Sequence, residues 1–272
     1  MNAAHGERGD VVLRAEGVSR TFAAPGGDVH ACVDVDLEVR AGELLVVRGA
    51  SGAGKTTLLN LLGGLDEPTS GRIVLDGHDL AELSEADLAA LRHRTLGIVF
   101  QSFGLIPVLS AAENVEVPLR ISRTDAAQRD ERVAAALAEV GLTAHAAQRP
   151  DELSGGQQQR VGIARAIVTE PRVLIADEPT GQLDSRTAAG VMDLLAELTH
   201  TRGIAAVVAT HDPLLVARAD RVVELHDGHI VPASADVDAG APASGAQAAG
   251  AQAAPPRTRA EARAARDRPA SG

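Results

Sequence analysis

Residues 49–56 read GASGAGKT and bring three glycines together with a lysine and a threonine. Glycine lets a loop curl until its backbone N–H groups point inward at an anion, and a helix that begins there adds the positive end of its dipole. In the pattern G-x-x-x-x-G-K-T, Lys55 reaches the β- and γ-phosphates of a nucleotide and the Thr56 hydroxyl binds Mg²⁺. We therefore predict a phosphate-binding site made by Gly49, Ala50, Ser51, Gly52, Ala53, Gly54, Lys55, Thr56 and Thr57.

The use of lysine in the chain supports this prediction. Of the 26 basic residues, Lys55 is the single lysine and the others are arginine. Arginine replaces lysine on a solvated surface, but not where a compact ammonium with three donors must fit among phosphate oxygens. A glycine-rich turn that matches the pattern by chance is the alternative, and the position of the lysine argues against it.

Two carboxylates follow a short apolar run at residues 173–178, VLIADE. The four apolar residues predict a buried strand, and Asp177 and Glu178 emerge at its carboxyl end. We predict that Asp177 holds Mg²⁺ through water and that Glu178 polarises the water that attacks the phosphate. Ordinary surface charge is the alternative, and it is weakened by the phosphate-binding loop earlier in the chain.

A second candidate anion site lies at residues 153–160, LSGGQQQR. Two glycines at the start of a helix leave its first backbone amides bare, and Ser154 is free to donate a hydrogen bond. We predict that Ser154, Gly155, Gly156 and Gln157 contact a nucleotide.

With these three motifs, residues 11–231 resemble the nucleotide-binding subunit of an ATP-binding cassette (ABC) transporter. The resemblance implies a role for four more residues. Gln101, in VFQS, matches the Q-loop glutamine that touches Mg²⁺, and Asp184, in GQLD, matches the D-loop, where Gln182 replaces the usual asparagine. His211, in VVATHD, matches the histidine that contacts the γ-phosphate and the attacking water. Phe22 aligns with the aromatic residue, usually tyrosine, that stacks on adenine.

The resemblance also implies partners. Two copies would sandwich two ATP molecules with Mg²⁺, so that Ser154 and Gly156 of one copy serve the nucleotide held by the other. An integral membrane permease would bind near residues 103–118, which places the chain at the cytoplasmic face of the cell membrane. The strings LLNLLGGLDEPTSG, VFQSFGLIP and ENVEVPLR look most like the branch that serves macrolide-exporter, lipoprotein-release and cell-division-associated permeases. The alternative is a non-transport ABC ATPase that acts on a soluble macromolecular complex.

The elements that must position these residues follow from the apolar pattern, which predicts strands separated by helices. We expect an α/β fold, a P-loop NTPase with a mostly parallel sheet, and the resemblance adds an N-terminal antiparallel β subdomain. Ser84 and the pair Ser110 and Glu113 predict helix starts. The strands are expected at 33–39, 44–48, 96–100, 173–176 and 204–210, with a hairpin over 221–231, and the helices at 56–62, 124–140 and 185–199.

Domain boundaries follow from composition. We predict a disordered N-terminus over residues 1–10, an ATPase domain over 11–232 with a helical subdomain inserted at about 102–165, and a disordered tail over 233–272 that is rich in Ala, Pro, Gly and Arg.

Charge and apolar runs exclude other classes. The 37 acidic and 26 basic residues give a net charge of −11, which disfavours a nucleic-acid partner. No apolar run reaches the ~20 residues of a membrane span, and no secretory signal is visible. The single cysteine, Cys32, fits a reducing compartment. The eight histidines other than His211 are expected to be surface residues.

Overall fold

The structure is a computed structural model that describes residues 9–212 and 216–231. The predicted tail at 233–272 and most of the predicted disordered N-terminus lie outside these residues. Gly9 and Asp10, assigned to that N-terminus, are described, and they are hydrogen-bonded to Arg40 and Ala41. The Arg40 guanidinium donates to Gly9 O at 3.3 Å, and Ala41 N–H donates to Asp10 O at 2.9 Å.

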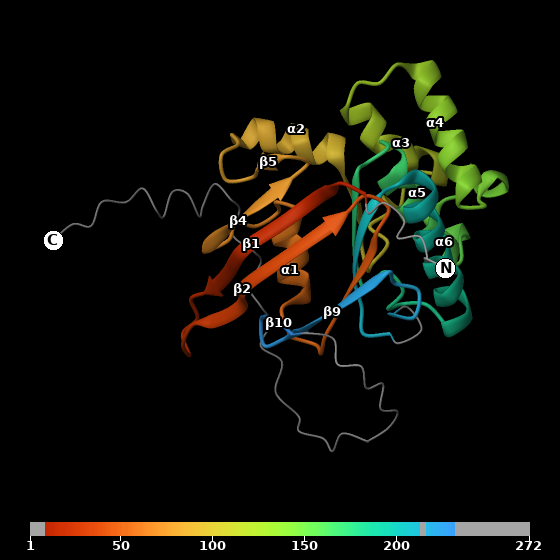
Figure 1. Cartoon of the computed structure of the whole chain (residues 1–272). Helices are drawn as coiled ribbons and strands as arrows, with labels where there is room; N and C mark the ends of the chain where they lie inside the picture. Colours follow the sequence, from red (N-terminus) through yellow and green to blue (C-terminus); the bar gives the residue numbers. More distant parts are fainter. Residues whose placement is uncertain (1–8, 213–215, 232–272) are drawn as a thin grey trace, which may run out of the picture.

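Two sheets form the framework (Figure 1). A four-stranded antiparallel sheet has the order β2-β1-β4-β5, and a six-stranded sheet, parallel except at β10, has the order β10-β9-β3-β8-β7-β6. This arrangement confirms the predicted fold class. The strands of the first sheet are β1 (Val11–Phe22), β2 (Val29–Arg40), β4 (Ser70–Leu75) and β5 (His78–Asp79). Those of the second are β3 (Leu44–Arg48), β6 (Leu96–Val99), β7 (Val173–Asp177), β8 (Ala205–Ala209), β9 (Arg221–His226) and β10 (His229–Val231).

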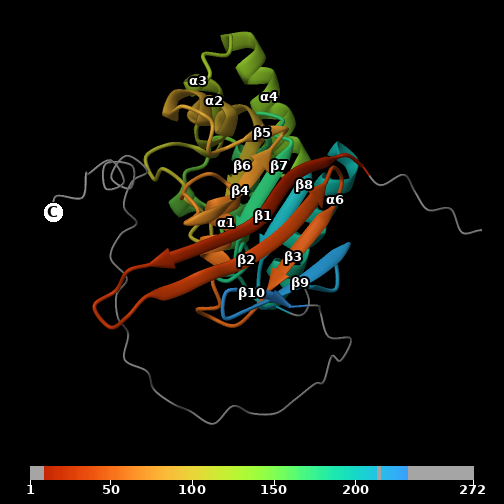
Figure 2. The same cartoon turned by 60° about the vertical axis from the view of Figure 1, so that its left-hand side comes forward.

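The apolar pattern did not predict strand β1, because the alternation of apolar and polar residues along it is interrupted. Its pairing with β2 shifts register at several places, one of them between Ala15 and Val18, where Gly17 has a φ of 57°. A bulge turns the following side chains to the other face, so a period of two no longer holds along the strand. Figure 2 shows β1 and β2 as long strands running diagonally across the molecule.

The helices are α1 (Lys55–Leu62), α2 (Glu85–Thr95), α3 (Ala111–Ile121), α4 (Ala126–Glu139), α5 (Gly155–Ile167) and α6 (Ser185–Arg202), with short 3₁₀ helices η1 (Thr143–His145) and η2 (Pro150–Glu152). The predicted helix starts are confirmed. Ser84 caps α2, and Ser110 with Glu113 forms a capping box on α3. Between β6 and β7 the described chain forms α3, α4, η1, η2 and α5. None of the helices in the described ranges combines the length and apolar character that crossing a bilayer requires.

The six-stranded sheet is buried on both faces. Leu44 and Val46 of β3 join an apolar core with α3, α4, α5 and α6. Leu45 and Val47 point the other way, into a core shared with α1 and the antiparallel sheet. Because both faces are covered, only the edges of the sheet can carry a solvent-facing site.

Candidate functional site

The ends of three neighbouring parallel strands bring the predicted residues together. Val47 of β3 pairs with Ala209 of β8, which in turn pairs with Asp177 of β7. Each strand is followed at once by a predicted motif: residues 49–56, Glu178 and His211. The carboxyl edge of a parallel sheet is where ligands bind in open α/β folds.

Glycine is required in the loop at residues 49–54 because other backbone segments press against it. A Cβ at Gly49 would lie 2.4 Å from the carbonyl oxygen of Leu225, and one at Gly54 would lie 2.0 Å from that of Ala31. Gly54 also has a φ of 102°, and α1 begins at the next residue. The loop is therefore a fixed turn that leads its amides into the start of a helix.

Lys55 is held inside this loop. Its side chain is only 9% exposed, and Nζ donates to Gly49 O at 2.8 Å and to Ala50 O at 3.1 Å. The nearest carboxylate atom is Oε1 of Glu178, at 3.7 Å. A buried ammonium held by two backbone oxygens is a strong site for the oxygens of an anionic phosphate.

Thr56 and Asp177 form the part of the site suited to a cation. The Thr56 hydroxyl donates to Asp177 Oδ2 at 2.7 Å, while Oδ1 of the same carboxylate is buried with no hydrogen-bond partner. Burial raises the pKa of Asp177, and the bond from Thr56 opposes that rise. Among the described residues, no group of three or more His, Cys, Asp or Glu is arranged to hold a metal ion by itself. Mg²⁺ at phosphate sites needs only one or two protein ligands besides the phosphates and water, so this pair fits it.

Glu178 and His211 form a pair beside Lys55. Oε1 of Glu178 lies 2.9 Å from Nδ1 of His211, and the Glu178 carboxylate is 15% exposed whereas the His211 ring is 72% exposed. Glu178 has a φ of 44°, a strained conformation for a residue with a side chain. Its N–H donates to Ala209 O at 2.9 Å, which fixes the turn. The arrangement presents a carboxylate base at the edge of the sheet with a histidine bound to it.

Three further predicted residues lie on other segments of the fold. Gln101 follows β6 and lies close to Gly181, three residues after Glu178. A Cβ added at Gly181 would be 3.2 Å from the amide nitrogen of Gln101. Asp184 caps α6, and a hydrogen bond from the Thr187 hydroxyl at 2.6 Å lowers the pKa of its carboxyl. Phe22 ends β1, where the guanidinium of Arg20 lies 4.5 Å from the centre of its ring.

The LSGGQ segment begins α5. Ser154 caps the helix, with Gln157 N–H donating to its hydroxyl at 3.3 Å. Gly156 has a packing role that the sequence did not reveal, because a Cβ there would lie 2.2 Å from Thr187 Cγ2 on α6. In the part of the chain that the structure describes, no hydrogen bond or ion pair joins this helix start to Lys55.

Comparison with known proteins identifies the family. The ABC transporter family model matches residues 32–181, more than half of the chain. The chain belongs to the ABC transporter family. It is an ATP-binding cassette, an ATPase.

Individual relatives of this chain are also named as ATP-binding proteins. The chain is 46% identical over 223 residues to the lipoprotein-releasing system ATP-binding protein LolD of Syntrophotalea carbinolica, covering 82% of this chain and 98% of that protein. It is also 46% identical over 234 residues to the macrolide export ATP-binding/permease protein MacB of Brucella melitensis. That match covers 86% of this chain but 36% of MacB, so the cassette spans about a third of that relative.

A solved structure shares the fold. The dimeric post-hydrolysis structure of the ATP-binding cassette MJ0796 bound to ADP and Pi matches with a TM-score of 0.73 and 37% identity, covering 80% of this chain and 96% of that one.

Sequence reasoning missed the residues that hold the Q-loop of this cassette to α5. Arg165 donates to Phe103 O at 3.1 Å and to Gly104 O at 2.5 Å, and Gln159 donates to Phe100 O at 3.5 Å. Phe103 and Gly104 both have positive φ, at 60° and 62°. Since the partners are backbone carbonyls, no spacing of residue types marks these contacts.

A second miss concerns two histidines, His93 and His145, which were expected to be surface residues but are half-buried. Nε2 of His93 is buried without a hydrogen-bond partner among the described residues, and the ring of His145 forms hydrogen bonds with the side chains of Gln148 and Gln157.

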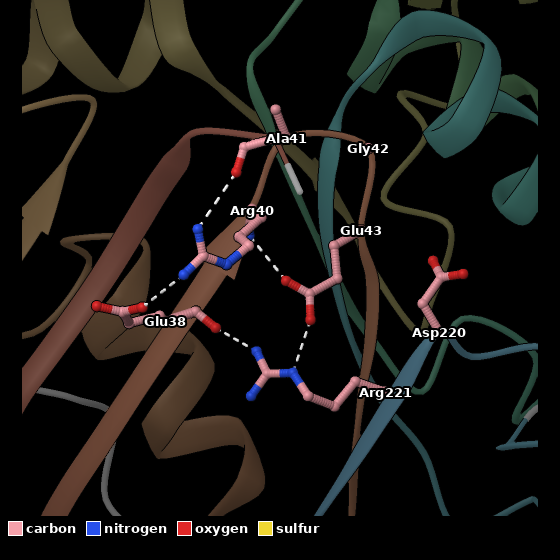
Figure 3. Close-up of a pocket in the computed structure, with 8 residues that line it drawn as sticks. Glu38, Arg40, Ala41, Gly42, Glu43, Asp220 and Arg221 are labelled. Carbon is pink, nitrogen blue, oxygen red and sulfur yellow. Dashed lines mark hydrogen bonds and ion pairs between the residues drawn. The ribbon is translucent and has the colours of Figure 1, made fainter. Parts of the chain in front are cut away.

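A cavity of about 520 Å³ lies at the opposite edge of the parallel sheet, before the first residues of β3 and β9 (Figure 3). Its charged groups satisfy one another. Arg221 Nε donates to Glu43 at 2.6 Å, Arg40 contacts Glu38 at 3.2 Å, and Asp220 accepts from Leu44 N–H at 2.7 Å. The cavity lies between the two sheets, and its lining residues include none of the predicted ATP-site residues.

Proposed function

We propose that this ATPase works as a homodimer that powers a separate membrane permease from the cytoplasmic side. Support comes from the separation of its two anion sites: Lys55 is buried at the start of α1, whereas Ser154 caps α5, and no hydrogen bond or ion pair among the described residues joins the two. Two copies placed head to tail complete two sites, each with one loop and one LSGGQ segment. Resemblance to LolD, an ATP-binding protein of a lipoprotein-releasing system, supports the permease branch.

Each residue then has a defined task in hydrolysis. The loop amides and Lys55 bind the phosphates of ATP, and the partner subunit's Ser154, Gly155 and Gly156 close over the γ-phosphate from the other side. Glu178 takes a proton from the attacking water while the water oxygen bonds to the γ-phosphorus. The bond between the γ-phosphorus and the bridging oxygen of ADP breaks, so that ADP leaves. His211 holds Glu178 through the 2.9 Å contact. Thr56, Asp177 and Gln101 would hold Mg²⁺, which neutralises charge on the phosphates.

Phe22 would hold the adenine. Arg20 covers one face of its ring at 4.5 Å, so the base would stack on the other face. Asp184 would contact the partner copy at the start of α6, where its carboxylate accepts a hydrogen bond from the Thr187 hydroxyl.

Sites shared between two copies predict complementation. Lys55→Ala and Ser154→Arg should each hydrolyse little ATP alone, because each damages both sites of its own dimer. A mixture should recover about a quarter of wild-type turnover, since about half of the dimers are mixed and each of those has one intact site. A phosphate-release assay of the separate and mixed variants measures this. A mixture no more active than its components would contradict a shared site.

The permease would bind a rigid apolar surface beside the Q-loop, formed by Phe100, Ile106 and Val108, which are 46%, 40% and 73% exposed. Ile106 and Val108 lie within the predicted contact region at 103–118. Asn114, fully buried, holds their loop in place: it accepts from Ile106 N–H at 2.7 Å and donates to Ser110 O at 2.9 Å. A fixed loop that exposes apolar side chains is typical of a protein interface.

Val108→Asp should abolish recovery of the cassette with its membrane partner while leaving the ATPase rate of the isolated subunit unchanged, because the side chain is exposed and belongs to none of the predicted nucleotide-binding motifs. Co-purification from detergent-solubilised membranes measures this. Ile121→Asp is the matched control, since Ile121 is 67% exposed and lies outside the proposed surface. Equal recovery of both variants would contradict the surface, and recovery of the wild type only in a soluble complex would favour the non-transport alternative.

A further inference from the structure

The start of α5 is tied to a side chain outside the LSGGQ segment. Gln157 uses both ends of its amide within its own subunit: Oε1 accepts from Ser154 N–H at 2.8 Å, and Nε2 lies 3.1 Å from Nε2 of His145. The other ring nitrogen of His145, Nδ1, lies 2.7 Å from Oε1 of Gln148. Gln148, His145, Gln157 and Ser154 therefore form one continuous line of hydrogen bonds.

The direction of this line is fixed by its last member. A backbone N–H such as that of Ser154 can only donate, so Gln157 must face it with oxygen and turn its NH₂ toward His145. Nε2 of the ring must then be the acceptor, and the proton of the neutral ring must lie on Nδ1, where it is donated to Gln148. Exchanging oxygen and nitrogen in either glutamine would bring two donors together.

We propose that His145, as the neutral ring with its proton on Nδ1, is a positioning residue for the LSGGQ segment. It holds the Gln157 amide in the one orientation that caps α5, and the cap fixes the backbone and hydroxyl of Ser154. This inference rests on the proposed function in one respect: Ser154 is taken to meet the ATP held by the partner subunit.

Protonation of the ring breaks the line. An imidazolium donates from both nitrogens, so Nε2–H would oppose the Gln157 NH₂ group. Turning the amide to relieve that contact would remove the acceptor from Ser154 N–H and open the capping box.

Charged groups on the neighbouring elements have partners of their own. Glu152 on η2 accepts from Arg149 N–H at 2.8 Å, Glu113 on α3 accepts from Ser110 N–H at 2.7 Å, and Arg160 on α5 donates to Val140 O at 3.0 Å. Asp151, also on η2, is exposed. Within the described ranges, none of these groups, Arg149 included, makes an ion pair with the ring.

Two substitutions at His145 separate positioning from simple packing. His145→Gln can place an amide oxygen near the position of Nε2 and does not titrate, whereas His145→Phe keeps a flat ring without an acceptor. Both are made in a Glu178→Gln background, and ATP-induced dimerisation is measured by analytical ultracentrifugation at about pH 7.5 and about pH 5.5. Thermal unfolding confirms that each variant is folded.

We expect His145→Phe to weaken the ATP-bound dimer about fivefold to tenfold at the higher pH, the size associated with losing one helix cap. His145→Gln should stay within about twofold of the parent there, and it should lose less affinity than the parent at the lower pH. Binding of a fluorescent ATP analogue to the monomer should be unchanged in both variants, because the phosphate-binding loop is not involved. A dimer of parental affinity in His145→Phe, or an equal acid loss in His145→Gln, would overturn the proposal.

A measurement without nucleotide keeps this inference distinct from the proposed function. ¹H–¹⁵N spectra of the histidine rings in the free protein should show the His145 proton on Nδ1, and the Ser154 amide signal should move as that ring titrates. A proton on Nε2 at neutral pH would overturn the proposal even if the dimer forms. If the parent fails to dimerise with ATP while the spectra are as expected, the homodimer is wrong and the role of His145 in holding Ser154 stands.

Discussion

Glu178→Gln is expected to accumulate as an ATP-bound dimer and to lose at least about a hundredfold in turnover, because an amide cannot take the proton from water. The substitution keeps the shape of the side chain and an oxygen that His211 can still contact at 2.9 Å. Binding should therefore survive while the step that releases the dimer does not. Size-exclusion chromatography with Mg-ATP and a phosphate-release assay measure the two effects.

The control for this variant is Glu170→Gln. Glu170 is exposed and, like Glu178, has a positive φ, of 56°, so it undergoes the same chemical change in a similar backbone conformation away from the site. It should elute as the wild type does and hydrolyse ATP at a normal rate. A monomer of Glu178→Gln under saturating Mg-ATP, or undiminished turnover, would count against the role given to this carboxylate.

Lys55→Ala is expected to abolish hydrolysis and to weaken ATP binding by at least about a hundredfold, the scale on which one preorganised donor at a charged group acts. Nζ lies among Gly49 O, Ala50 O and Glu178, and its loss leaves the loop without a positive charge for the phosphates. Lys55→Arg should fail similarly, because a planar guanidinium does not fit a side chain that is only 9% exposed. Equilibrium binding of a fluorescent ATP analogue measures both.

A control variant and a chemical modification test the role of Lys55 further. Arg48→Ala removes a cation at the end of β3 that is already paired with Glu224 at 3.0 Å, and it should have only a small effect. Because Lys55 is the only lysine, modification of its amine by a small amine-selective reagent can be followed in the one peptide that carries it, and ATP should slow that modification. Modification that ATP does not slow, or full turnover in Lys55→Ala, would refute the assignment.

Much of the fold followed from local pattern. The hairpin of β9 and β10, the capped starts of α2 and α3, and the buried strands β7 and β8 lie where apolar period and cap residues indicate them. These features depend on residues near one another in the chain. Strand β1 is the exception, since its bulges remove the alternation that marks a strand.

By itself, the sequence determined the chemical groups of the cassette, because a lysine in a glycine loop, carboxylates after a buried strand and a bare helix start each require particular residues at particular spacings. Only the tertiary structure decided how those groups are held. The Arg165 contacts to the Q-loop, the approach of Thr187 to Gly156 and the line from His145 to Ser154 join segments through backbone atoms or single side chains. Such contacts depend on how elements pack in space, and packing leaves no spacing rule in the chain.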